Sequence, residues 1–170
     1  MANRLEGASR PGHFDGVLTV VMKLFQLVQP HCAIFGKKDY QQLAIIRKMV
    51  TDYLLPLAIV PAETSRESDG LARSSRNRYF DDQHRSIAPL ISAGLQEAAQ
   101  LFSRGERQTA KLRETVLAKI SSHPAFAVEY VEICRRDSLE PCGEQITEAA
   151  VILVAARLAG VRLIDNWELD

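Results

Sequence analysis

Two short apolar segments with a helix between them constrain the fold more than any other part of the sequence. Residues 32–35 and 57–60 are apolar, and each is followed by a residue that interrupts regular structure, Gly36 and Pro61. Residues 41–54 carry apolar side chains at the intervals of three and four that predict a helix. A strand, a helix and a second strand in so short a stretch predict a βαβ unit, in which two buried strands run parallel and the crossover is right-handed.

A longer helix is expected before the first strand. Residues 17–28 are apolar except at Thr19, Lys23 and Gln26, whose spacing of four and three is typical of the polar stripe of a mostly buried helix. A proline two residues after this segment ends the helix. The preceding residues 1–16 contain several glycines and a proline, which predicts a loop.

The remainder of the chain predicts a second, smaller subdomain. Residues 61–78 are polar and irregular, and they form the connection to it. Two helices follow, from Asp81 or Asp82 to about Arg104, with a kink at Pro89 and a stop at Gly105, and over residues 107–120. Three strands are expected at residues 127–134, 150–156 and 161–164. Helices followed by a mainly antiparallel sheet are typical of an α+β fold.

The charge balance and the cysteines exclude several classes of function. The 170 residues include 21 Lys and Arg against 21 Asp and Glu, so the basic surface that generic nucleic-acid binding requires is not expected. Three widely spaced cysteines favour a reducing cytoplasm over a disulfide framework or a zinc ribbon. The first residues lack the apolar core that a secretory signal needs, so none is expected, and the longest apolar run, residues 149–156, is too short to cross a membrane. The histidines lack metal-ligand spacing, so no metal site is expected.

The turn after the first strand is the first candidate for chemistry. Ligands of open α/β sheets bind beyond the carboxyl ends of parallel strands, where Gly36 would allow a close approach to the backbone. Lys38 could neutralise a phosphate, with help from the N–H groups of the next helix, and Asp39 could accept hydrogen bonds from ribose hydroxyls. The alternative is a solvated turn in which Asp39 caps the helix. Of the two glutamines that follow, Gln41 and Gln42, each could bind a polar substrate or simply lie on the helix surface.

Two further loops carry polar groups. Ser74, Ser75 and Arg76, followed by Asn77, could clamp a polyphosphate, although they form no Walker loop. The alternative for them is a polar turn leading into a helix. Residues 6–14 gather an arginine, a histidine and glycines before a buried helix, and they form either a mobile gate over a site or an exposed loop. No base neighbours Cys142 in sequence, which disfavours a nucleophile there.

Taken in order and spacing, these segments closely resemble pantothenate synthetase, the pantoate–β-alanine ligase family. The similarity covers nearly the whole chain and is carried by Leu5-Glu6-Gly7, Arg10-Pro11-Gly12-His13-Phe14, Gly16-Val17, Thr19-Val20-Val21, Lys23-Leu24-Phe25, Phe35-Gly36, Lys38-Asp39-Tyr40-Gln41-Gln42-Leu43, Asp69-Gly70-Leu71-Ala72, Ser74-Ser75-Arg76-Asn77, and the tail segments 150–156 and Leu163-Ile164-Asp165-Asn166.

The resemblance implies a fold and a reaction. The fold would be the second half of a Rossmann-like nucleotidyltransferase domain, residues 1–66, then a hinge and phosphate-binding loop, residues 67–78, and an α+β lid with an antiparallel sheet, residues 79–170. The reaction would use ATP and magnesium to convert pantoate to pantoyl adenylate, which the amine of β-alanine then attacks to give pantothenate and AMP. Family members are usually homodimers.

The resemblance also implies roles for individual residues. Lys38 would bind an ATP phosphate, and Gly36 and Asp39 would hold the ribose. Gln42 would orient pantoate for its attack on the α-phosphate. The phosphates would be gripped by Ser74, Ser75 and Arg76, and the loop bordering the site would contain Glu6, Arg10 and His13.

Three departures from the family pattern matter. The sequence contains no His-x-Gly-His motif, and the second pantoate-binding glutamine and the acidic magnesium-site residues of the family are also missing. Lys37 stands where the family usually has Glu, and the polar residues 61–65 replace an apolar segment. The chain is therefore expected to be incomplete alone, with strand edges that invite pairing with an amino-terminal partner segment.

Three hypotheses remain open. The chain is the carboxy-terminal portion of the ligase, or a non-catalytic remnant that binds a nucleotide or a partner chain, or part of an adenylate-forming ligase that acts on another hydroxy acid.

Overall fold

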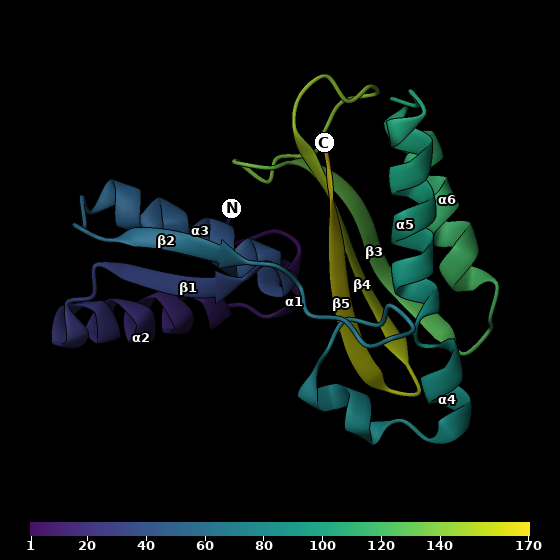
Figure 1. Ribbon diagram of the computed structural model, residues 1–170, viewed down its shortest axis with the longest axis horizontal. Coiled ribbons are helices and arrows are strands. Elements are labelled where there is room, and N and C mark those ends of the chain that lie inside the picture. The colour runs from purple at the N-terminus through teal and green to yellow at the C-terminus, as the bar shows by residue number, and fades with distance from the viewer. The chain divides into compact units, whose positions relative to one another are not determined.

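A computed structural model describes all residues from 1 to 170, and they form two compact units, Met1–Glu63 and Thr64–Asp170 (Figure 1). Each unit has its own sheet and its own hydrophobic core. The first contains the expected βαβ unit, and the second contains the expected antiparallel sheet. None of the helices is both long enough and apolar enough to span a membrane.

The first unit is built around a parallel pair of strands. Its elements are α1 Glu6–Ser9, α2 His13–Val28, β1 Cys32–Gly36, a single 3-10 turn Lys37–Asp39, α3 Tyr40–Asp52 and β2 Ala58–Ala62. The register places Ile34 opposite Val60. The strand–helix–strand prediction is therefore confirmed, including the parallel direction of the two strands.

The core of this unit lies on one face of the sheet. Phe25 from α2 and Ile46 and Met49 from α3 are buried against side chains of both strands, and Phe25 meets the ring of Phe35 edge-on at 6.3 Å between centroids. The opposite face of the sheet is bare within the unit, because Ile34 is 69% exposed and Val60 is 42% exposed.

The sequence predicted a mostly buried helix and two buried strands, and both predictions are wrong for this unit by itself. The strands alternate between exposed and half-buried residues, and α2 presents a second apolar stripe to solvent. The exposed members of that stripe are Val20, Leu24, Leu27 and Val28. An apolar face of this kind marks a surface that another part of a protein covers.

The expected limits of elements in the first unit also change. Residues 1–16 are not all loop: they contain α1, and α2 begins at His13 rather than residue 17, after Gly12 takes a positive φ of 75°. Gly12 makes this start possible because glycine adopts that conformation without a steric cost. The second strand continues through Pro61 to Ala62, since a proline is tolerated in an edge strand.

The second unit stacks two helices on an antiparallel sheet (Figure 1). Its elements are a 3-10 turn Ser75–Tyr79, α4 Asp82–Ile87, α5 Leu90–Ser103, α6 Thr109–Ser121, β3 Phe126–Arg135, β4 Ala150–Leu158 and β5 Val161–Leu169. The strand order is β3-β4-β5. Ala159 and Gly160, both with positive φ, form the two-residue turn between β4 and β5 that suits the twist of an antiparallel hairpin.

Local signals set the ends of the helices. Asp81 caps α4, because its carboxylate accepts a hydrogen bond from the backbone N–H of His84 at 2.8 Å. Pro89 does more than kink the expected long helix, since α4 ends before it and α5 begins after it. Gly105, with φ 101°, follows the last turn of α5 as predicted.

The core of the second unit is closed. Leu95 of α5 and Leu112, Val116 and Ile120 of α6 have no exposed surface, and they pack with the inward side chains of the sheet. The two helices approach closely at Gly94, where a β-carbon would lie 3.1 Å from Cβ of Lys119 and 3.3 Å from the carbonyl oxygen of Val116.

Glu106 prepares the start of α6. Its Oε1 accepts the N–H groups of Arg107 and Gln108, each at 2.9 Å, and its Oε2 lies 2.6 Å from Nζ of Lys111. The hydrogen bond from Lys111, followed by those from the two backbone amides, lowers the pKa of Glu106 to about 2.

We predict that Glu106→Gln lowers the melting temperature at neutral pH. Because the folded pKa lies below the usual value of 4.5, the carboxylate stabilises the fold above that value and loses this effect as the pH falls towards about 2. The difference in melting temperature between wild type and variant should therefore shrink across this range. Glu114→Gln, in an exposed position of the same helix without an ion pair, serves as the control. A difference that stays constant down to pH 2 would contradict the role of the charge.

Candidate functional site

The turn after β1 leads directly into the first turn of α3. Gly36 ends the strand, Lys37–Asp39 form the 3-10 turn, and Tyr40 begins the helix. Asp39 is exposed and occupies the N-cap position, yet its side chain makes no capping hydrogen bond, so the cap that was the alternative interpretation is wrong. Uncapped N–H groups at a helix start, next to a lysine, form an arrangement that binds anions.

Lys37 forms an ion pair within the chain, whereas its neighbour Lys38 is the residue expected to bind a phosphate. The Nζ of Lys37 lies 2.6 Å from Oε1 of Glu63, just beyond β2, and only 16% of the Lys37 side chain is exposed. The strand register pairs Gly36 with Ala62, so the ion pair continues that register by one position. The two departures from the family pattern at residue 37 and within residues 61–65 thus meet in space.

The two glutamines of α3 have different environments. Gln41 is buried: its Oε1 accepts the backbone N–H of Glu6 at 3.0 Å, and its Nε2 donates to the carbonyls of Met1 at 2.9 Å and Arg4 at 2.8 Å. Gln42 is half-buried, and its amide makes no hydrogen bond within the chain. Gln41 is therefore a structural residue, and Gln42 is the one whose amide remains open to a ligand.

The expected gate loop is a folded segment tied to α3. Gly7 is buried against the chain start, where a β-carbon would lie 1.6 Å from the carbonyl oxygen of Ala2. Arg10 is exposed, and its Nη1 lies 3.0 Å from Nε2 of His13. The backbone of Glu6 is held by Gln41. This segment thus carries an exposed arginine and a half-buried histidine, and its backbone is held by α3.

The serine-rich loop, residues 74–77, belongs to the second unit. Ser74 turns its hydroxyl inward, where Oγ accepts the backbone N–H of Arg76 at 3.2 Å. Ser75 and Arg76 are exposed, and neither side chain has a hydrogen bond or an ion pair. Asn77 donates from Nδ2 to the carbonyl of Ala72 at 3.1 Å, and its buried Oδ1 has no partner.

A second ion pair lies between the segments on either side of this loop. Oδ2 of Asp69 is 2.5 Å from Nη1 of Arg85 in α4, and Oδ1 accepts the backbone N–H of Leu71 at 3.1 Å. The hydrogen bond with Arg85 lowers the pKa of Asp69 and raises the pKa of Arg85. Sequence reasoning missed this pair because nothing local signals a partner sixteen positions away.

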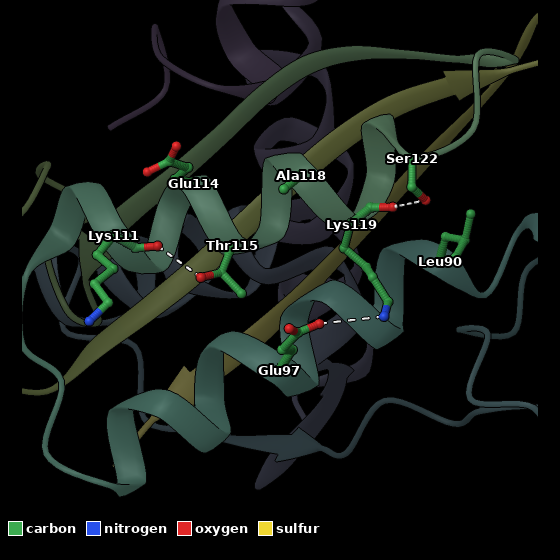
Figure 2. A pocket seen from close by; sticks show the side chains of 8 residues that line it. All are labelled: Leu90, Glu97, Lys111, Glu114, Thr115, Ala118, Lys119 and Ser122. Carbon is green, nitrogen blue, oxygen red and sulfur yellow. Dashed lines mark hydrogen bonds and ion pairs between the residues drawn. The ribbon is translucent and has the colours of Figure 1, made fainter.

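Two hollows of the surface are lined by residues other than the predicted ones. One hollow, of about 600 Å³, is lined by residues of α5 and α6. Figure 2 shows its lining side chains, with Lys119 reaching towards Glu97. Another of about 600 Å³ lies in the first unit, lined by Leu18 and Met22 of α2 and Ile45 and Met49 of α3. No group of three or more His, Cys, Asp or Glu residues is placed to hold a metal ion.

The candidate residues therefore form two groups. Gly36, Lys38, Asp39 and Gln42 lie at the carboxyl end of β1 and the start of α3, together with the segment around Glu6. Residues 74–76 form one loop of the other unit.

Comparison with known proteins identifies the family. The family model described as pantoate-beta-alanine ligase matches residues 1–168. The chain belongs to this family. The pantothenate synthetase of Geobacillus kaustophilus is 48% identical over 169 residues, which are 99% of this chain and 56% of that protein. The chain thus spans a little over half the length of this ligase relative, as expected for a carboxy-terminal portion.

Solved structures of family members share the fold. Pantothenate synthetase from Thermus thermophilus superposes with a TM-score of 0.93 at 40% identity, over 99% of this chain and 60% of that one. Pantoate-beta-alanine ligase from Francisella tularensis, complexed with beta-gamma ATP and beta-alanine, gives a TM-score of 0.66 at 30% identity. It covers 98% of this chain and 54% of that one. The predicted combination of a parallel βαβ part and a separate antiparallel sheet is confirmed.

We predict that the two glutamines respond differently to substitution. Gln41→Ala removes three part-buried hydrogen bonds that tie the first six residues to α3, and one such bond typically contributes about 0.5–1.5 kcal/mol. Limited proteolysis should then cut residues 1–9 faster and the melting temperature should fall. Gln42→Ala should leave both unchanged. Equal behaviour of the two variants would refute the distinction.

Proposed function

We propose that this chain provides the carboxy-terminal portion of an ATP-dependent ligase that joins pantoate to β-alanine through a pantoyl adenylate. The observation that carries the proposal is the match of the family model to residues 1–168, with Lys38 at the end of a parallel strand. The ATP and β-alanine named for the Francisella tularensis relative support the same chemistry.

The adenylation step needs alignment and charge neutralisation more than covalent help. The carboxylate of pantoate attacks the α-phosphorus of ATP, the bond to the β-phosphate oxygen breaks, and pyrophosphate leaves. Lys38 and the uncapped N–H groups of α3 would bind phosphate oxygens at one end, with Gly36 and Asp39 beside the ribose. The amide of Gln42, which has no partner in the chain, would orient pantoate.

The second group, residues 74–76, would bind the β- and γ-phosphates of ATP, which leave as pyrophosphate. Ser75 and Arg76 are exposed and without partners, while Ser74 shapes the loop with its hydroxyl. A guanidinium can bind two phosphate oxygens at once, which suits the developing charge of pyrophosphate. In the second step the amine of β-alanine attacks the acyl carbon and AMP leaves. Glu6, Arg10 and His13 would border the site, supported by α3.

By the resemblance, magnesium would accompany ATP and be held largely by its phosphates, and none of the residues named above is assigned as its ligand. We therefore assign no step to a metal here.

The bare face of the parallel sheet supports the view that the chain acts with another segment. Parallel sheets are normally covered on both faces, whereas Ile34 and Val60 of this sheet are exposed. An amino-terminal partner segment of the family, or a second copy in a homodimer, would cover them. A cytoplasmic location fits the three cysteines, none of which is in a disulfide.

A non-catalytic remnant that binds a nucleotide or a partner is the second candidate, and the exposed apolar side chains of Ile34 and Val60, which a partner chain could cover, favour it. Purified chain would be assayed for AMP release with ATP, pantoate and β-alanine, alone and with the amino-terminal portion of the Geobacillus kaustophilus relative. Pantoate-dependent AMP release from the mixture supports the ligase. No release under any condition would leave the remnant as the better description, and a faster reaction with another hydroxy acid would reassign the substrate.

We predict that Lys38→Ala and Arg76→Ala each reduce adenylate formation by the complemented enzyme about 100-fold, the usual loss for one preorganised charge contact. Lys48→Ala, which removes an exposed lysine paired with Asp52 on α3, should change little. The measurement is pyrophosphate exchange, with circular dichroism to check folding. Wild-type rates in either variant would remove that residue from the site.

A further inference from the structure

A short hairpin precedes the serine-rich loop without any intervening residue. Arg66 and Ala72 form an isolated antiparallel bridge, and the backbone N–H of Arg73 donates to the carbonyl of Ser65 at 2.9 Å. Gly70 turns the chain with φ 89°. Ser74 follows at once, so the position of the hairpin sets where the loop begins.

Arg66 fixes this hairpin to β5. Its Nη1 and Nη2 donate to the two carboxylate oxygens of Asp165 at 2.7 and 3.0 Å. Nη1 also donates to the carbonyl of Gly70 at 3.0 Å, and Nη2 to that of Asn166 at 3.4 Å. The guanidinium lies 5.2 Å from the ring centre of Trp167. One side chain therefore joins the hairpin, its own turn and the strand.

The pair is largely removed from water. The side chain of Asp165 is 3% exposed and that of Arg66 is 20% exposed. Asp165 also accepts the backbone N–H of Asn166 at 2.8 Å, so its oxygens are well supplied with donors. A buried ion pair is poor evidence for net stability, because an apolar pair of similar size is often as stable. The specific effect of this pair is to fix the position of the hairpin relative to β5.

The loop is thus held by its base while its ligand-facing groups stay open. Leu71 and Ala72 are buried beside the pair, and Asn77 is hydrogen-bonded back to Ala72. Asp69 at the turn is joined to Arg85 beyond the loop. A loop that is already ordered loses less conformational entropy when a ligand binds.

We propose that Arg66 and Asp165 are positioning residues, which hold residues 74–76 in the arrangement that receives the phosphates of ATP. That the ligand is ATP rests on the proposed function. The bracing, by which the Arg66–Asp165 pair holds the hairpin against β5, does not depend on it. Neither residue is assigned contact with the substrate; both act through the hairpin.

The bracing is tested by hydrogen exchange on the full chain without ligand. Asp165→Asn removes the charge, and Arg66→Met with Asp165→Leu replaces the pair with apolar side chains that keep the fold stable. Both should speed exchange in residues 65–80 while the amides of α5 and α6 stay protected. Glu129→Gln is the matched control, because it breaks ion pairs with Arg157 and Arg162 in the same sheet without touching the hairpin. Unchanged exchange in residues 65–80 of the double variant would overturn the bracing.

The positioning role is tested with the complemented enzyme. The double variant should lose about 100-fold in kcat/KM for ATP, the scale expected when a binding group is displaced by an ångström, while KM for β-alanine stays the same. Glu129→Gln should keep wild-type values. An active wild type whose double variant has unchanged ATP kinetics would overturn this inference alone. A wild type that binds no ATP would contradict the proposed function, whatever the exchange data show.

Discussion

The parallel pairing of β1 with β2 is the constraint on which the first unit depends. Because both strands run in the same direction, the chain must cross over through α3, and that helix begins where β1 ends. Gly36, Lys38 and the uncapped N–H groups of α3 are therefore gathered at one edge by topology. The ion pair of Lys37 with Glu63 lies one position beyond the last residues of the strand register.

The two units differ in how completely they bury their apolar surface. In the second unit α5 and α6 cover the sheet, and the largest core side chains have almost no exposed area. In the first unit one sheet face and one stripe of α2 remain bare. At about 25 cal/mol for each Å² removed from water, covering such a face is a substantial driving force for association. In the proposed function, an amino-terminal partner segment or a second copy would provide that cover.

Local sequence patterns predicted most of the helices and strands, but they could not predict contacts between residues far apart in the chain. Periodicity gave α3 and α6, Asp81 gave a cap, and the apolar runs gave the positions of all five strands, because these signals lie within a few residues. The predicted end of β5 at Ile164 was wrong, since the strand continues through polar residues to Leu169. The start of α2 at His13 was missed, since glycines near a helix start look like a loop. The separate roles of Gln41 and Gln42 could not be predicted either, because they depend on a segment 35 to 40 positions away.

The arginines around the serine-rich loop fall into two kinds: those that pair with other side chains of the fold, and one that remains open to a ligand. Five lie within residues 66–85. Four are engaged: Arg66 with Asp165, Arg73 with Glu67, Arg78 with the ring and hydroxyl of Tyr79, and Arg85 with Asp69. Arg76 alone has no partner. A guanidinium already paired with a carboxylate offers a phosphate little net charge, whereas an unpaired one on an ordered loop offers all of it. The sequence shows five equivalent cations, and only their partners in space single out Arg76.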